Sequence, residues 1–375
     1  MEMTLAAAGS SPERRAPAGP PVWPILGAFL GSRLLIVLAA LAAETLLTRN
    51  PQLNSGASGP LVTSFTAWDG WWYLGIVHNG YHAAPLISGY FDYAFFPLYP
   101  LLVRGLAFPF PAFAGLVAVL LSNALFLLAL ALLYRLTREV LDEDRALMAS
   151  VYLAIFPFSF VFSMAYAESL FLVLSLGSLL AAERGRAGWA AVLASLAGST
   201  RLTGVLLIVP LALILWRRVA DRRSVAWLVL VPLGAGLFYL YVAHLTGTLS
   251  GYGAAESAWG RGGVSTSPAG GDLASHLDVL RLSLLATLLA FVFLLVYLRP
   301  DRIPLAYATI PVLTLGAVLA SGLLESVGRY AMLAFPFTWT LAGRRSAWFR
   351  TAWPAVSAGL LGLLALLAFG GYYVP

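Results

Sequence analysis

Apolar residues occur in long runs that recur from Val22 to Gly370, and short polar segments separate one run from the next. Each run has about the ~20 residues that a helix needs to cross a bilayer. Runs such as 116–133 do not alternate with the period of two that the strands of a membrane barrel require. The pattern therefore predicts an all-α polytopic membrane protein.

The composition agrees with this prediction. Hydrophobic residues make up 60% of the 375 residues, charged residues only 11%, and the mean hydropathy is +0.84. Soluble domains contain about 25% charged residues, so the chain is not a water-soluble globule. The net charge of +6 would suggest nucleic acid in a soluble protein, but membrane topology accounts for it here. We expect membrane lipid, and no nucleic acid, as a partner.

No cofactor chemistry is visible in the sequence. The chain has no Cys, which excludes disulfides, Cys-ligated zinc and thiol catalysis. We find no Gly-rich nucleotide motif, Walker motif or His-Glu metal spacing. The four His residues also make a dedicated His-metal site improbable on number alone. We therefore expect neither a metal ion nor a bound cofactor.

The basic residues are all Arg, which is typical of a GC-rich genome and favours a bacterial source. Most of them form clusters between apolar runs, and the positive-inside rule places these clusters in the cytoplasm. Between two cytoplasmic clusters the chain must cross the membrane an even number of times. This parity predicts eleven spans, with the amino terminus inside and the carboxyl terminus outside. The predicted spans are 25–47, 113–134, 146–163, 168–182, 188–200, 203–216, 224–245, 276–298, 304–322, 330–343 and 351–371.

The remaining segments define the domain organisation. Residues 1–20 are predicted to be a disordered cytoplasmic tail, and 21–375 a single integral membrane domain. Two outer segments are long enough to hold a site: 48–111, and the Gly/Ser/Ala-rich segment 246–275, which we interpret as a mobile loop. The parity of the spans also requires two short helices that meet at residues 199–203.

The first outer segment contains an isolated acid among aromatic rings, Asp69 in the stretch TAWDGWWYLGIVHNGY (66–81). Thr66 and Asp69 have the spacing of a capping box, so Asp69 could cap the start of a short helix that runs to Gly80. The Trp and Tyr residues would then form an interfacial belt. Aromatic faces, however, also pack against sugars and isoprenoid chains. A carboxylate in such surroundings is partly desolvated and makes a better general base.

Several motifs in this order resemble the family of GPI mannosyltransferase II (PIG-V) and its bacterial relatives. Leu202 stands where the family usually has Pro, which removes a helix-breaking residue. The resembling residues are Trp68-Asp69, Trp72-Tyr73, Asn79-Gly80-Tyr81, Phe95-Phe96-Pro97-Leu98-Tyr99-Pro100, Ala165-Tyr166-Ala167-Glu168-Ser169-Leu170-Phe171, Ser199-Thr200-Arg201-Leu202-Thr203-Gly204, and Gly328-Arg329-Tyr330 with Phe335-Pro336.

The resemblance implies a GT-C fold, a multi-spanning glycosyltransferase with its active site on the outer face of the membrane. Such enzymes take a sugar from a lipid phosphate and invert its anomeric centre. Their base is usually an acid in the first outer loop, and Asp69 matches it. Glu168 is the second catalytic candidate, although an acid at the start of a helix can also serve the exposed N–H groups alone.

Two arginines are candidates for binding the donor phosphate. Arg201 and Arg329 fall at predicted outer ends of spans, against the positive-inside bias, and a guanidinium binds two phosphate oxygens at once. Each could instead be an interfacial arginine that pairs with a neighbour, such as Glu325 for Arg329. Candidate sugar- and lipid-binding residues are Trp68, Trp72, Tyr73, Tyr81, Phe96, Tyr99, Tyr166 and Tyr330.

The predicted function is therefore transfer of a hexose, by resemblance mannose, from a polyprenyl-phosphate sugar to an envelope glycan, glycolipid or protein acceptor. The predicted location is the plasma (inner) membrane, with an extracytoplasmic active site. Two alternatives stay open. A transporter or flippase of lipid-linked sugars would also have many spans, although its polar residues would gather at the midplane. An accessory subunit of an envelope glycosylation complex is the other.

Overall fold

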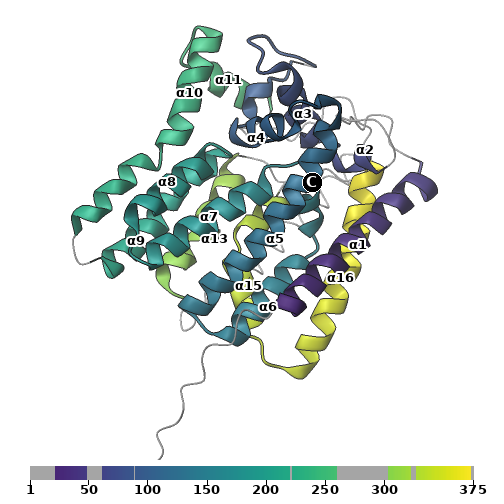
Figure 1. The fold of residues 1–375 in the computed structure, drawn as a ribbon, viewed down its shortest axis with the longest axis vertical. Coiled ribbons are helices and arrows are strands. Elements are labelled where there is room, and N and C mark those ends of the chain that lie inside the picture. The colour runs from purple at the N-terminus through teal and green to yellow at the C-terminus, as the bar shows by residue number, and fades with distance from the viewer. Residues whose placement is uncertain are drawn as a thin grey trace, which may run out of the picture.

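The computed structural model describes residues 22–48, 61–87, 89–219, 222–259, 303–321 and 327–372. Every regular element in these ranges is helical, as predicted (Figure 1). The predicted tail 1–20, the predicted span 276–298 and most of the predicted mobile loop lie outside the described residues.

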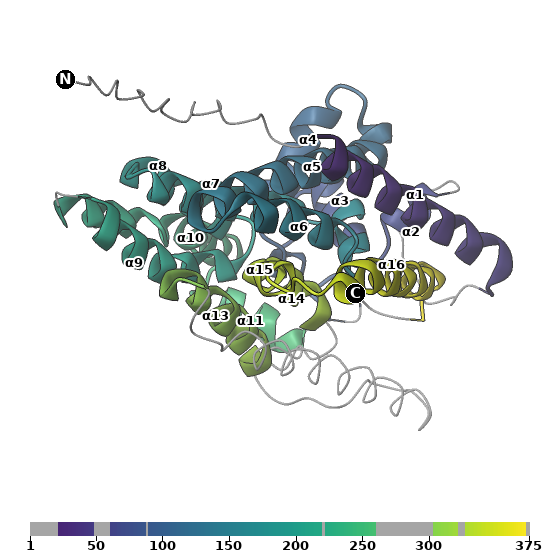
Figure 2. The same ribbon diagram turned by 90° about the horizontal axis from the view of Figure 1, so that it is seen from below.

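Two long apolar helices form one side of the molecule. The helix α1 (Val22–Leu46) packs along α16 (Ala347–Gly370), although the two lie at opposite ends of the sequence (Figures 1 and 2). Many of their large apolar side chains are exposed, for example Leu34 and Val356. Exposed apolar faces of this kind are expected where a helix contacts lipid rather than water.

The centre of the bundle is built on α5 (Ala114–Val140), which packs against α6 (Glu143–Ala154) and α7 (Glu168–Glu183). With 27 residues, α5 is about 40 Å long, more than a bilayer core requires. Asp142 caps α6 by accepting a hydrogen bond from the backbone N–H of Arg145 at 2.8 Å. Buried small residues let α8 (Ala187–Gly198) pack closely on α7.

The second half of the bundle contains shorter helices. They are the 3₁₀ helix η4 (Leu202–Leu207), α9 (Ile208–Arg218), the 3₁₀ helix η5 (Arg222–Leu230), α10 (Leu233–Thr246), α13 (Leu305–Ser321), α14 (Val327–Leu333) and α15 (Pro336–Ala342). The predicted pair of short helices around residues 199–203 is present as α8 and the η4–α9 unit.

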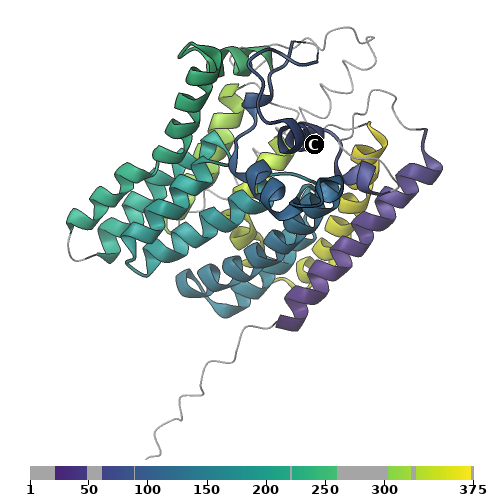
Figure 3. The ribbon, with the colours of Figure 1, turned by 45° about the horizontal axis from the view of Figure 1, so that its top comes forward.

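The described residues of the predicted first outer segment fold over one end of the bundle. The segment holds α2 (Val62–Phe65), α3 (Asp69–Asn79), the 3₁₀ helix η1 (Asp92–Ala94), α4 (Leu98–Ala107) and the 3₁₀ helix η2 (Pro111–Phe113). Beside it lie the top of α10 and the short helix α11 (Gly251–Ala258) (Figures 1 and 3). The presence of α11 was not predicted, because the segment was interpreted as a loop.

Several predicted spans are interrupted at prolines. The predicted helix 146–163 ends at Ala154, three residues before Pro157, and continues only as the 3₁₀ helix η3 (Ser159–Ser163). The predicted helix 330–343 is two helices, and Pro336 begins the second. Proline donates no backbone hydrogen bond and its ring clashes with the preceding helical turn, so the predicted continuous helices were wrong at these two places.

Four helical stretches among the described residues are long and apolar enough to cross a membrane: Val22–Leu46, Pro111–Val140, Arg222–Thr246 and Ala347–Gly370. Shorter apolar helices such as Ala187–Gly198 and Leu305–Ser321 accompany them. These helices agree with a multi-pass membrane protein. The total of eleven spans stays a prediction.

Candidate functional site

Asp69 is the first residue of α3, and the predicted helix up to Gly80 is present. The predicted capping box is not formed. The residue that precedes the helix is Trp68, which makes no side-chain capping hydrogen bond, so Asp69 lies at the start of the first turn rather than at its third position. The carboxylate of Asp69 accepts a hydrogen bond from Arg329 instead.

The backbone before Asp69 is strained. Trp68 has a φ of 57°, a region that bulky residues rarely adopt, at a cost of about 1–3 kcal/mol. Two contacts oppose this cost: the Trp68 indole donates to the carbonyl of Ala368 at 3.1 Å, and the N–H of Ala165 donates to the carbonyl of Phe65 at 2.8 Å. The surrounding structure thus holds Asp69 at a defined place beside the motif that contains Glu168.

Glu168 is the first residue of α7, and only 2% of its side chain is exposed. Its Oε1 accepts a hydrogen bond from Nη1 of Arg201 at 2.5 Å and lies 3.4 Å from Nε of Arg329. One buried carboxylate therefore contacts both candidate phosphate ligands.

Arg201 lies in the sharp connection between α8 and η4. Its backbone is extended (φ −160°, ψ 142°), so the chain turns here without the proline that the family usually has in place of Leu202. The turn depends on a close backbone approach: a Cβ on Gly204 would lie 2.4 Å from the backbone nitrogen of Gly198. This contact explains the glycine that ends the motif, because no other residue leaves the space.

Arg329 lies on α14 and is 3% exposed. Its predicted alternative partner, Glu325, lies outside the described residues. Nη1 of Arg329 donates to Oδ2 of Asp69, and its guanidinium carbon lies 5.5 Å from the ring centre of Tyr166. The ring of Tyr330 lies 4.5 Å from the guanidinium carbon of Arg201. Both cations are thus held between carboxylates and aromatic faces.

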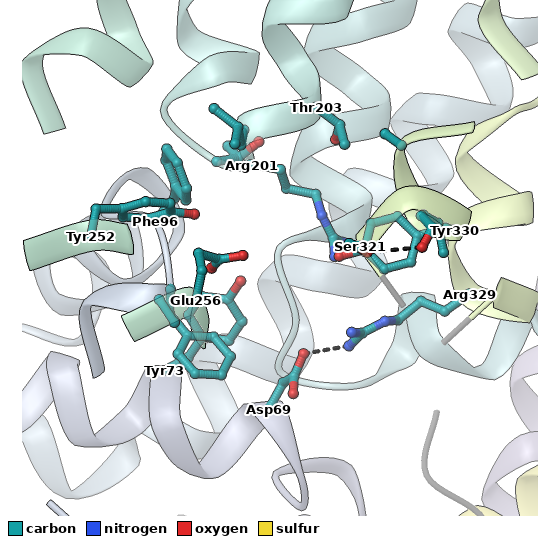
Figure 4. Close-up of a pocket in the computed structure, with 16 residues that line it drawn as sticks. Asp69, Tyr73, Phe96, Arg201, Thr203, Tyr252, Glu256, Ser321, Arg329 and Tyr330 are labelled. Carbon is teal, nitrogen blue, oxygen red and sulfur yellow. Dashed lines mark hydrogen bonds and ion pairs between the residues drawn. The ribbon is translucent and has the colours of Figure 1, made fainter. Parts of the chain in front are cut away.

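These four charged groups come from α3, α7, the α8–η4 turn and α14, and three of them face one cavity (Figure 4). The cavity has a volume of about 150 Å³, which is room for several water molecules. Asp69, Arg201 and Arg329 line it, whereas Glu168 is not among the lining residues. The side chain of Asp69 is 23% exposed, so Asp69 is accessible to a ligand and Glu168 is not.

Of the predicted aromatic residues, Tyr73, Phe96 and Tyr330 line the cavity. The other five do not line it and pack elsewhere in the structure. Trp72 stacks on Phe95 with ring centres 5.7 Å apart, and the Tyr81 hydroxyl donates to the carbonyl of Phe95 at 2.7 Å. Tyr99 and Tyr166 are fully buried, and Trp68 faces α16. For these five residues a direct contact with sugar or lipid stays a prediction.

Sequence reasoning missed several lining residues. Tyr252 and Glu256 reach the cavity from α11, Thr203 from η4, and Ser321 from the end of α13. Tyr252 and Glu256 are four residues apart, a spacing that indicates one face of a helix. This spacing could have revealed them, but the richness in Gly and Ser around them favoured a loop.

Asp92 and His78, two further ionisable groups of the predicted first outer segment, lie elsewhere. His78 is exposed at the end of α3. Asp92 is buried and contacts Nδ1 of His82 at 2.8 Å. Burial raises the pKa of Asp92 above its usual value, and the hydrogen bonds from His82 oppose this only in part. Neither residue lines the cavity.

The described part of the chain contains no group of three or more His, Asp or Glu residues that could hold a metal ion. The expectation of a metal-free and cofactor-free site stays a prediction.

Solved structures with a similar fold are membrane glycosyltransferases of low identity. The oligosaccharyltransferase of Archaeoglobus fulgidus, tethered to an acceptor peptide, is 14% identical to this chain, with a TM-score of 0.49. The match covers 95% of this chain and 56% of the oligosaccharyltransferase. ArnT from Cupriavidus metallidurans, bound to undecaprenyl phosphate, is 14% identical to this chain, with a TM-score of 0.47. That match covers 94% of this chain and 77% of ArnT. The chain thus spans little more than half of the oligosaccharyltransferase. No curated protein sequence matches it.

The sequence comparison with family models is more specific. Residues 37–218 match the family described as mannosyltransferase (PIG-V), a segment that contains Asp69, Glu168 and Arg201. The resemblance inferred from the motifs is thereby confirmed: residues 37–218 are similar to the PIG-V mannosyltransferases.

Proposed function

We propose that the chain is an inverting glycosyltransferase that transfers a hexose from a polyprenyl-phosphate sugar to an acceptor outside the cytoplasm. The similarity to PIG-V mannosyltransferases indicates that this hexose is mannose. The acceptor is an envelope glycan, a glycolipid or a protein hydroxyl. One observation carries the proposal: a carboxylate and two arginines, Asp69, Arg201 and Arg329, line the same cavity. The arginine clusters between spans support an extracytoplasmic site in the plasma membrane.

The two arginines suit the phosphate of the donor. A guanidinium stays charged in buried surroundings and binds two phosphate oxygens at once. Arg201 and Arg329 approach the cavity from different elements, the α8–η4 turn and α14. In this position they stabilise the negative charge that grows on the phosphate as the sugar leaves.

Asp69 suits the role of general base. The acceptor hydroxyl oxygen attacks the anomeric carbon while its proton passes to Asp69. The bond between that carbon and the phosphate oxygen breaks, and the phosphate leaves with the electron pair. A hydroxyl is a poor nucleophile without a base, and such proton transfer typically contributes 10²–10⁴-fold. Asp69 is the better candidate than Glu168 because it lines the cavity.

Asp69 and Arg329 form an ion pair at the cavity. A donor phosphate brings negative charge next to Arg329 and competes with Asp69 for its N–H groups. Binding of the donor therefore frees the Asp69 carboxylate to accept a proton at the moment when the substrate is in place. Glu168 keeps both arginines oriented during this exchange through its contacts at 2.5 and 3.4 Å.

The test is a paired assay of sugar transfer and thermal stability on Asp69→Asn and Asp69→Ala. Asn keeps the shape of the side chain and removes proton acceptance, so transfer should fall at least ~10²-fold while the protein stays folded. Binding of the donor lipid should persist or tighten, because Arg329 then has one carboxylate fewer to compete with the phosphate.

Asp92→Asn is the matched control, since Asp92 belongs to the same outer segment but does not line the cavity. It should transfer sugar at nearly the wild-type rate. A merely structural Asp69 predicts the opposite pattern, with the Asn variant active and the Ala variant unstable. Near wild-type transfer by Asp69→Asn would overturn the proposed mechanism.

A further inference from the structure

The wall of the cavity opposite the arginines comes from α11, an eight-residue helix in the second outer segment. Tyr252 and Glu256 lie one turn apart on it and both line the cavity. In Figure 4 the carboxylate of Glu256 lies between the rings of Tyr252 and Tyr73, across the cavity from Arg329.

Aromatic contacts hold α11 in this place. The ring of Trp259, directly after the helix, lies 5.1 Å from that of Trp72 and 5.5 Å from that of Phe95. Its indole N–H donates to the carbonyl of Phe91 at 3.2 Å. Tyr252 contacts Phe96 with ring centres 5.8 Å apart. The first outer segment thus fixes the position of Glu256 relative to Asp69 and its neighbours.

Charge decides what each wall can bind. A phosphate is attracted to the two arginines and repelled by a carboxylate, so the phosphate of a donor belongs at Arg201 and Arg329 rather than at Glu256. The sugar is bonded directly to that phosphate. In a cavity of about 150 Å³ it therefore occupies the space between the arginines and α11.

The residues on this wall have the chemistry of a sugar site. A carboxylate accepts hydrogen bonds from hydroxyl groups, and such charge-assisted bonds are stronger than neutral ones. The rings of Tyr73, Phe96 and Tyr252 offer apolar faces to the C–H groups of the sugar. The wall is therefore suited to a neutral group with several hydroxyls.

We infer that Glu256 is a specificity-determining residue that accepts hydrogen bonds from the hydroxyl groups of the donor hexose, with Tyr252 packing beside it. This inference rests on the proposed function, because it takes the donor to be a polyprenyl-phosphate sugar. It assigns Glu256 to recognition of the sugar and not to the chemical step or to the phosphate.

The experiment compares equilibrium binding of two lipids, polyprenyl-phosphate mannose and unglycosylated polyprenyl phosphate, to the purified full-length protein. Glu256→Gln should weaken binding of the mannosyl lipid roughly tenfold or more, because one charged acceptor is lost. Binding of the unglycosylated lipid should not weaken, because the carboxylate makes no attractive contact with a phosphate. Glu256→Asp, which keeps the charge on a shorter side chain, should retain part of the preference. Ser257→Ala, an exposed neighbour on α11, is the control and should bind both lipids normally.

The outcomes distinguish failure of the proposed function from failure of the role assigned to Glu256. If the wild type binds neither lipid, the proposed function fails. If the wild type binds both and Glu256→Gln leaves binding of the mannosyl lipid unaffected, the inference is overturned while the proposed function stands. Equal loss of both lipids in the Gln and Asp variants also overturns it, because Glu256 would then maintain the fold rather than recognise the sugar.

Discussion

Glu168 and Arg201 form a buried ion pair at 2.5 Å, and the same carboxylate oxygen lies 3.4 Å from Arg329. The pair joins the start of α7 to the turn after α8. Because Glu168 does not line the cavity, its contribution is to hold the arginines in place and to balance part of their charge. Removing one partner of a buried pair leaves the other charge uncompensated, which is why this contact is a sensitive test of the site.

Glu168→Gln should therefore weaken donor binding and lower stability. The amide keeps one acceptor but leaves two buried cations with a single acid, and breaking such pairs costs about 3–5 kcal/mol. Thermal unfolding and binding of polyprenyl phosphate measure the two effects. Glu139→Gln is the control, because Glu139 pairs with Arg184 on the exposed surface, where a pair contributes about 0–1 kcal/mol. Donor binding unchanged in Glu168→Gln would contradict the assigned role.

Arg329→Lys and Arg201→Lys should each reduce turnover strongly. Lysine keeps the positive charge but cannot make the bidentate contact with a phosphate, and the loss of one transition-state contact often costs about 2.7–4 kcal/mol. Steady-state transfer rates measure this loss, and Arg184→Lys provides an exposed control. If both Lys variants keep wild-type activity, neither arginine holds the phosphate.

The buried carboxyl group of Asp92 should make the stability of the protein depend on pH. Burial raises its pKa in the folded protein above the value of about 3.9 expected in the unfolded chain. The folded state therefore binds more protons, and the contribution of Asp92 to stability decreases as the pH rises above about 4. The melting temperature of Asp92→Asn should rise relative to that of the wild type between pH 4 and 7. A relative fall over this interval would show that burial does not dominate at Asp92.

The predicted topology can be tested with single cysteines, since the chain has none of its own. His78→Cys and Ser265→Cys should react with an impermeant thiol reagent on intact cells, because both positions fall in predicted outer segments. Arg345→Cys, in the arginine-rich segment between the predicted spans 330–343 and 351–371, which is predicted to be cytoplasmic, should react only after permeabilisation. The reverse pattern would place the cavity on the cytoplasmic side and remove the basis for an extracytoplasmic donor.

Local patterns in the sequence determined much of the fold. Apolar runs predicted α1, α5, α7, α8 and α16 close to their observed bounds, because a helix in lipid must satisfy its own backbone and shows a long apolar run as a result. The motifs also identified Asp69, Arg201 and Arg329, which line the cavity, and Glu168, which contacts both arginines. Isolated charges in apolar surroundings are costly, so they are visible in a sequence and usually functional.

Only the tertiary structure decided how these charges are paired. Asp69 contacts Arg329 across 260 positions of sequence, and Glu168 contacts Arg201 rather than capping α7 alone. Arg33, outside the predicted clusters, proved to be buried, where it donates to the hydroxyls of Ser159 and Ser163 at 2.7 and 2.9 Å. Glu256 reached the cavity from a segment interpreted as a loop. These relationships depend on packing between distant helices, which local periodicity and spacing do not encode.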